Sequence, residues 1–135
     1  MKMGWGSWIG LAGLAAIVVA VALPMYGDYT HRAQSAEAMA LLSEAKAPLR
    51  AYFAQHGKWP NKILSATESQ HTERIAISRG AGGTGEIELT ATMRVTADSR
   101  VAGRSIRLVS RDGGASWTCS AGTMEAKNLP ADCRN

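Results

Sequence analysis

Hydrophobic and polar residues follow three different patterns along the chain. Residues 3–27 are almost wholly apolar and contain no charged side chain. From Asp28 onward apolar residues recur every three or four positions among charged ones, which is the pattern of a helix that buries one face. After residue 72 apolar and polar residues alternate in short runs, as they do in strands with one covered side. The chain therefore predicts one long helix followed by a sheet.

The helix is predicted to run without interruption from about residue 5 to about residue 56. Pro24 and Pro48 each lack a backbone N–H and crowd the carbonyl four residues earlier, so a helix that continues through both should be curved. Gly57 is its expected C-terminal cap, and Pro60 follows as a stop signal. Beyond the apolar segment, its buried face is expected to consist of Ala38, Leu41, Leu42, Ala45, Leu49, Tyr52 and Phe53.

Four strands are expected after a polar connector that ends at about residue 72. In the second strand the apolar side runs from Ile87 to Val95. Glycine-rich segments at 80–85 and 112–114 are expected to be turns. The alternating segments that predict the strands are 75–77, 87–95, 106–109 and 116–119.

The apolar face of the helix is the only surface large enough to cover the apolar side of such a sheet. The sequence therefore predicts an α+β fold, in which a long curved N-terminal helix packs on an antiparallel sheet of about four strands. Residues 28–135 are expected to form this folded part, outside any membrane. Its core is predicted to contain Leu42, Leu49, Phe53, Leu89, Met93 and Ile106.

Residues 1–27 are predicted to be the membrane-inserted part of the helix. About 25 uncharged residues at ~1.5 Å each extend about 37 Å, which is enough to cross a bilayer. The alternative is a cleaved secretion signal, because Ala20, Val21 and Ala22 follow an apolar run as a cleavage site does. The positions expected to face lipid or packed helices are Trp8, Ile9, Leu11, Leu14, Ile17, Val18, Val21, Leu23 and Pro24.

Two cysteines, Cys119 and Cys133, lie fourteen positions apart near the C-terminus. A zinc site needs four ligands, and the chain contains no Cys-x-x-Cys pair, so no metal is expected. In an exported chain the two cysteines predict one disulfide, whereas in a cytosolic protein they would be free thiols.

The charged residues, the glycine-rich segment and the histidines predict neither catalysis nor cofactor binding. The formal net charge is +4, but basic residues are scattered among acidic ones, so no nucleic-acid footprint is expected. The glycine-rich segment 80–85 lacks the lysine and the following helix of a phosphate loop. His31, His56 and His71 stand in polar contexts and are expected at the surface. We therefore expect a protein that is not an enzyme.

Three segments together resemble type IVa pilins. They are ALPMYGDYTHRAQSAEAMAL, the helix end AYFAQHGKWP and the terminal WTCSAGTMEAKNLPADCR. The resemblance covers most of the chain and implies the pilin fold, with a disulfide between Cys119 and Cys133 and with Trp59 and Pro60 at the exit from the helix. It also implies that the N-terminal helix anchors each subunit in the inner membrane and later packs with its neighbours in the core of an extracellular filament.

The function implied by the resemblance is that of a structural subunit of a type IV pilus, which supports adhesion, twitching motility or DNA uptake. Its partners would be copies of itself and other pilins, the inner-membrane assembly machinery, and host or abiotic surfaces. Ser7 stands where the family has a glutamate that pairs with the terminal amine of a neighbouring subunit, so the sequence predicts poorer self-assembly. Two alternatives remain, namely a pilin-like accessory or tip protein of the inner membrane and a secreted, signal-cleaved binding protein.

Overall fold

The computed structural model describes the backbone of residues 5–133; side chains are described at Ala16 and from Tyr29 to Cys133, with Asp132 excepted. The chain divides into two compact units between Thr30 and His31. The second unit, from His31 onward, is called the head domain. In order along the chain, the elements are α1 (Trp5–His56), β1 (Thr72–Arg79), β2 (Ile87–Met93), β3 (Ser105–Ser110), β4 (Thr118–Ala121) and two short 3₁₀ helices, η1 (Ala126–Asn128) and η2 (Ala131–Cys133).

The α1 helix confirms the single long helix predicted from the periodicity. It continues through both Pro24 and Pro48, each of which removes one N–H from the hydrogen bonds of the helix. It ends where Gly57 takes a φ of 69° and donates its N–H to the carbonyl of Phe53 at 2.8 Å. Only glycine adopts this left-handed conformation without steric penalty, so Gly57 is an effective C-terminal cap.

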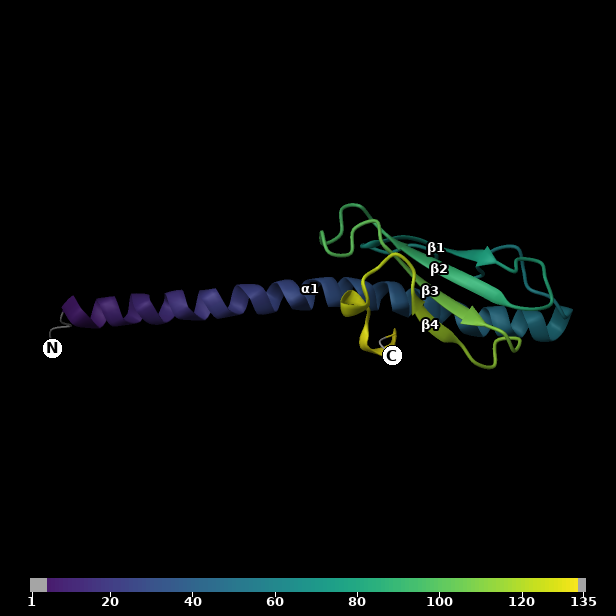
Figure 1. Cartoon of the computed structure of the whole chain (residues 1–135), viewed down its shortest axis with the longest axis horizontal. Coiled ribbons are helices and arrows are strands. Elements are labelled where there is room, and N and C mark those ends of the chain that lie inside the picture. Colours follow the sequence, from purple (N-terminus) through teal and green to yellow (C-terminus); the bar gives the residue numbers. More distant parts are fainter. Residues whose placement is uncertain (1–4, 134–135) are drawn as a thin grey trace. The chain divides into compact units, whose positions relative to one another are not determined.

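The four strands form one antiparallel sheet in the order β1-β2-β3-β4, so each strand pairs with its neighbour in sequence (Figure 1). The register aligns Leu89 with Leu108 and Leu108 with Cys119, all on the side of the sheet that faces α1. The predicted α+β fold, a helix packed on a four-stranded antiparallel sheet, is therefore confirmed.

β1 and β3 are longer than the predicted segments 75–77 and 106–109, and the end of the second strand and the position of the fourth also differ from the prediction. The second strand was expected to reach Val95, but β2 ends at Met93 and Val95 is 82% exposed. The reason is that the chain turns at residues 94–97, where the N–H of Ala97 donates to the carbonyl of Arg94 at 3.1 Å, while Nε of Arg94 donates to the carbonyl of Ser69 at 3.1 Å. The turn takes Val95 away from the sheet, although the alternation of apolar residues continues to it.

The fourth strand begins at Thr118 rather than at residue 116. Asp112 holds the preceding turn, because its carboxylate accepts hydrogen bonds from the hydroxyl of Ser110 at 2.9 Å and from the N–H and hydroxyl of Ser116. The turn therefore extends to Ser116, which the alternation of apolar residues alone does not indicate.

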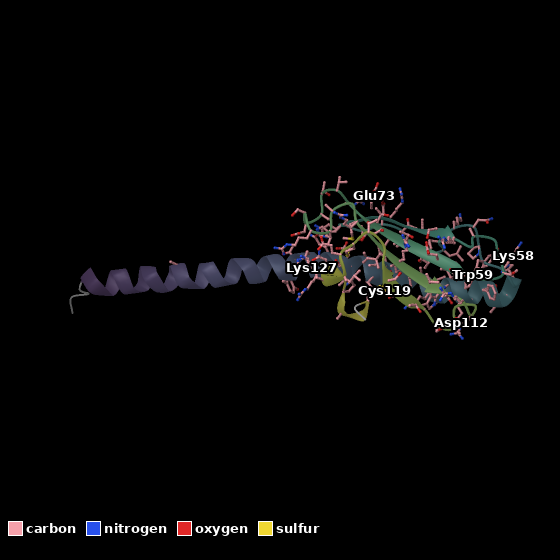
Figure 2. The ribbon with its side chains drawn as sticks, viewed as in Figure 1. Lys58, Trp59, Glu73, Asp112, Cys119 and Lys127 are labelled. Atoms are coloured by element: carbon pink, nitrogen blue, oxygen red, sulfur yellow. A yellow bond between two sulfur atoms is a disulfide. The ribbon has the colours of Figure 1, made fainter. Side chains whose placement is uncertain are left out.

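The head-domain core lies between α1 and the sheet. Trp59, which follows the helix, is fully buried, whereas Phe53 is only partly buried and packs against it with ring centroids 4.5 Å apart. Trp59 lies at the C-terminal end of α1 (Figure 2). The largest fully buried apolar side chains besides Trp59 are Leu42, Leu49, Ile87, Leu89, Met93, Val101, Ile106 and Leu108.

Trp59 is held in place by the glycine-rich turn between β1 and β2. Its indole Nε1–H donates to the carbonyl of Gly85 at 2.8 Å, and its backbone N–H donates to the carbonyl of Gly83 at 2.8 Å. The turn itself requires glycine at position 80, where φ is 84° and a Cβ would lie 2.0 Å from the carbonyl oxygen of Glu86. The expected turn at 80–85 thus also closes the core over the helix end.

Candidate functional site

Cys119 and Cys133 form a disulfide that joins β4 to η2. Their Cα atoms lie 5.1 Å apart, within the usual range for a disulfide. This confirms the pairing that the resemblance implied. The bond closes residues 119–133 into a loop, called the C-terminal loop below.

The C-terminal loop is attached to α1 by polar and sulfur contacts. The fully buried hydroxyl of Ser35 lies 2.9 Å from the carbonyl oxygen of Asn128, to which it donates. The sulfur of Met39 lies 3.9 Å from that of Cys119 and 3.7 Å from that of Cys133. The position of the loop on the head domain is therefore fixed at both ends.

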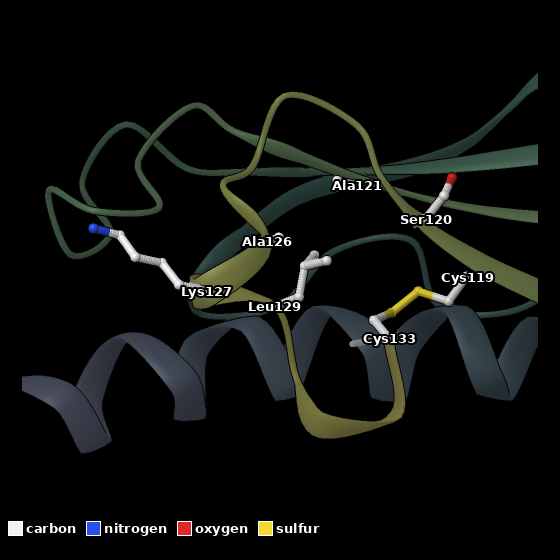
Figure 3. Close-up of a pocket in the computed structure, with 7 residues that line it drawn as sticks. All are labelled: Cys119, Ser120, Ala121, Ala126, Lys127, Leu129 and Cys133. Carbon is white, nitrogen blue, oxygen red and sulfur yellow. A yellow bond between two sulfur atoms is a disulfide. The ribbon is translucent and has the colours of Figure 1, made fainter. Parts of the chain in front are cut away.

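A hollow of about 520 Å³ lies beside the disulfide (Figure 3). Lys127 extends away from the disulfide and its Nζ lies 3.4 Å from the carboxylate of Glu125. Apart from Lys127 and the Ser120 hydroxyl, the lining is small or apolar, and it offers no acid–base pair in reach of a nucleophile. This hollow is suited to contact rather than catalysis, and its lining residues are Cys119, Ser120, Ala121, Ala126, Lys127, Leu129 and Cys133.

The side of α1 that is not covered by the sheet carries mostly small side chains. Its exposed small residues recur every three or four positions and so form one stripe, called the alanine face. Small side chains allow the backbone of a second helix to approach closely. The spacing of alanines is visible in the sequence and is the signal that could have indicated this face. The alanine face consists of Ala33, Ala36, Ala40, Ser43, Ala47, Ala51 and Ala54.

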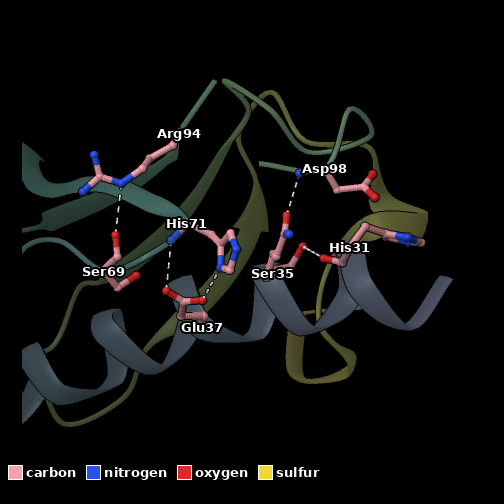
Figure 4. A network of polar contacts seen from close by, with 8 residues as sticks. His31, Ser35, Glu37, Ser69, His71, Arg94 and Asp98 are labelled. Carbon is pink, nitrogen blue, oxygen red and sulfur yellow. Dashed lines mark hydrogen bonds and ion pairs between the residues drawn. The ribbon is translucent and has the colours of Figure 1, made fainter. Parts of the chain in front are cut away.

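A network around Glu37 attaches the end of the connector to α1 (Figure 4). One carboxylate oxygen of Glu37 accepts the backbone N–H of His71 at 3.1 Å, and the other lies 2.8 Å from Nδ1 of the same residue. Arg94 reinforces the attachment. Its Nε donates to the carbonyl of Ser69, and its guanidinium forms an ion pair of 3.5 Å with the carboxylate of Glu68. The network positions the start of β1 against the helix.

Lowering the pH is expected to weaken this attachment. Burial alone would raise the pKa of Glu37, but the contacts of its carboxylate with the nearby Ser69 hydroxyl and with the N–H and ring of His71 outweigh burial and lower the pKa below its usual value of 4.5. The unfolded chain then binds a proton at a higher pH than the folded chain does. The free energy of unfolding should therefore begin to fall near pH 4.5 and fall further as the pH drops through the lowered pKa.

Urea unfolding between about pH 7 and about pH 3 measures this effect. Glu37→Gln should be less stable at neutral pH and should lose less stability on acidification than the unaltered chain. Glu73→Gln, which removes an exposed carboxylate from β1, is the matched control and should keep the original slope. Equal slopes for both variants would contradict the assignment to Glu37.

Two of the three histidines differ from the prediction that they are at the surface. His31 is 3% exposed, and its Nδ1 lies 2.9 Å from the Arg100 guanidinium, which donates to it. His71 is half-buried through its contact with Glu37. His56 is exposed as predicted. Both corrections have the same origin, because loops distant in sequence fold over these positions.

The predicted filament-core or membrane positions from Trp8 to Pro24 lie outside the residues whose side chains are described, and so does Ser7. Among the described residues, no helix combines enough length with enough apolar character to cross a membrane.

Comparison with known proteins assigns this chain to a family. The pilin family, which comprises bacterial filament proteins, matches residues 31–134. The fimbrial protein EcpC of Eikenella corrodens is 35% identical over 88% of this chain and 80% of its own length. A fimbrial protein of Neisseria meningitidis serogroup A is 30% identical over 90% of this chain and 86% of its own. The type IV major pilin protein PilE1 of Neisseria gonorrhoeae is 28% identical over the same shares.

The family match includes the C-terminal loop, the four-stranded sheet and the helix that carries the alanine face. The expectation of a structural protein rather than an enzyme is confirmed by this match, since the family consists of filament proteins. The chain is thus a member of the pilin family and is homologous to the major subunits of type IV pili.

Proposed function

We propose that the protein is a structural subunit of a type IV pilus and that it polymerises with copies of itself and with other pilins. The alanine face carries the proposal, because it leaves one side of α1 open to close contact with another helix. A lone soluble domain has no need of such a face, whereas a filament made from packed helices requires one.

The apolar part of the helix has two successive roles in this proposal. Residues 1–27 hold the subunit in the inner membrane until the assembly machinery moves it into the filament, where the same residues bury each other. The residues from Trp8 to Pro24 would form this contact, with Ser7 in the place of an acidic partner for the terminal amine. The finished filament extends from the bacterial surface toward host or abiotic surfaces.

The disulfide supports export, since disulfides persist in oxidising compartments outside the cytoplasm. The C-terminal loop and the sheet form the part of the head domain that does not take part in helix packing. Adhesion and motility would therefore depend on these surfaces, and filament assembly on α1.

Placing a larger side chain on the alanine face is expected to reduce filament assembly without unfolding the head domain. Ala40→Gln places a longer side chain on this face, and glutamine is a good helix former, so stability should change by less than about 0.5 kcal/mol. We expect the amount of this chain in sheared surface filaments to fall at least about fivefold, because the neighbouring helix can no longer approach.

Ala81→Gln makes the same change at an exposed position in the turn between β1 and β2 and should leave the filament yield unaltered. Equal yields from both variants would show that the alanine face does not contact another subunit. If the unaltered chain is absent from filaments that contain the other pilins, it is not a structural subunit. Its retention in the inner membrane under those conditions would favour the accessory role.

A further inference from the structure

A groove between α1 and the segment leading into β4 has the chemistry of a ligand site. Two adjoining hollows of about 440 and 360 Å³ form it, and both are lined by Lys46 from α1 and by Trp117 from the β4 side. The first hollow also contains Arg50, and the second contains the hydroxyls of Ser43 and Thr118. We call this feature the Trp117 groove.

Two cations in the Trp117 groove are available to a ligand. Neither Lys46 nor Arg50 makes an ion pair or a side-chain hydrogen bond within the described part of the chain. Because they are four residues apart, both lie on the same side of α1. A pair of unneutralised cations on one wall favours an anionic ligand.

Two carboxylates lie near these cations. Glu44 is close in the sequence, and Asp112 lies across the groove. Glu44 is two residues from Lys46 and therefore points from a different side of the helix. Asp112 is engaged by Ser110 and Ser116, whose hydrogen bonds lower its pKa to about 2, with the bonds from Ser116 as the main cause. Neither carboxylate lies within ion-pair distance of Lys46 or Arg50.

Trp117 provides a flat apolar surface beside the cations. It is half-buried and lines both hollows, and its ring lies 6.3 Å from that of buried Trp59, measured between centroids. Its indole N–H makes no hydrogen bond within the described residues. Gly114 brings the backbone of the turn so close to α1 that a Cβ would lie 3.2 Å from Cβ of Arg50, which fixes the base of the arginine side chain.

We propose that the Trp117 groove binds a polysaccharide that carries carboxylate groups. The carboxylates would contact Lys46 and Arg50, one sugar ring would stack on Trp117, and the hydroxyl of Thr118 would bond a sugar hydroxyl. The elongated shape of two adjoining hollows fits a chain rather than a single sugar. Single-stranded nucleic acid is the less suitable polyanion, because its sites stack successive bases on several aromatic rings and this groove offers one.

The test uses the full-length chain in a sugar-free non-ionic detergent and a fluorescent tetragalacturonate, whose binding is followed by anisotropy. Lys46→Gln together with Arg50→Gln should weaken binding at least about tenfold, since two charge-assisted contacts are lost. Trp117→Leu should also weaken it, while keeping an apolar side chain. Lys46→Arg with Arg50→Lys keeps both charges and should retain binding, which separates loss of charge from loss of folding.

Arg74→Gln with Arg79→Gln removes the same charge from β1, the other edge of the sheet, and is the matched control. It should change affinity by less than about twofold. The proposal is overturned if this control weakens binding as much as the groove variant does, or if tetragalacturonate does not bind at all. It is also overturned if a neutral maltotetraose or a thymidine dodecamer binds more tightly than tetragalacturonate.

The inference does not rest on polymerisation, because binding is measured on the unassembled chain. If the binding test fails, the proposed role of the alanine face in assembly still stands. If the Ala40→Gln test fails, the proposed ligand site still stands.

Discussion

Replacing Trp59 with alanine is expected to lower the free energy of unfolding of the head domain by about 3–5 kcal/mol. The side chain is fully buried and is the largest in the core. Its removal leaves a cavity between the end of α1 and the β1–β2 turn and also exposes the face of Phe53 that packs on it. The carbonyl of Gly85 would lose the indole donor that now lies 2.8 Å away.

Urea unfolding followed by circular dichroism measures this loss. Trp59→Phe keeps much of the apolar volume and removes the indole N–H with a smaller part of the ring, so a smaller loss than for Trp59→Ala is expected. Trp117→Ala is a control for the loss of a tryptophan as such, since Trp117 is half-buried and should be less important to folding. A loss below about 1 kcal/mol for Trp59→Ala would contradict the assigned burial.

Removing the disulfide is expected to have an effect of similar size. Cys133→Ser should destabilise the head domain by about 2–5 kcal/mol and reduce the amount of exported protein. The bond closes a loop with a sequence separation of 14, so its loss increases the conformational freedom of the unfolded chain. The variant also replaces a buried sulfur that contacts Met39 with a hydroxyl that has no obvious partner there.

Mass spectrometry of the unreduced chain should show the peptides of Cys119 and Cys133 linked, and urea unfolding of Cys133→Ser gives the change in stability. Ser120→Ala, next to Cys119 and exposed, is the control and should change stability by less than about 0.5 kcal/mol. Full labelling of both thiols in the native, unreduced protein would disprove the bond.

Secondary structure was predictable because it depends on local periodicity. The helix from about residue 5 to 56 ends at Gly57, where a glycine can adopt a positive φ, and the alternation after residue 72 marks the strands. Val95 shows the limit of this reasoning. The alternation continues to that residue, but β2 stops at Met93 because the chain turns at residues 94–97, where the N–H of Ala97 donates to the carbonyl of Arg94.

The candidate surfaces were only partly predictable. The cysteine pair followed from resemblance, because two cysteines fourteen positions apart do not show by themselves whether they meet. The Trp117 groove could not be predicted, since Lys46 and Trp117 are 71 positions apart in the chain, as their numbers give, and no local pattern links them. The alanine face was visible as a spacing of small residues, yet only the structure shows that the sheet leaves it uncovered.

One long helix, a small antiparallel sheet and the helix face that lies against the sheet all follow from the sequence. Periodicity and turn residues encode these features within short segments. Three features follow only from the folded structure: Trp59 rather than Phe53 fills the end of the core, His31 is buried, and the C-terminal loop lies on α1 at Ser35. These features depend on hydrogen bonds and packing between segments far apart in the chain, which a local pattern cannot specify.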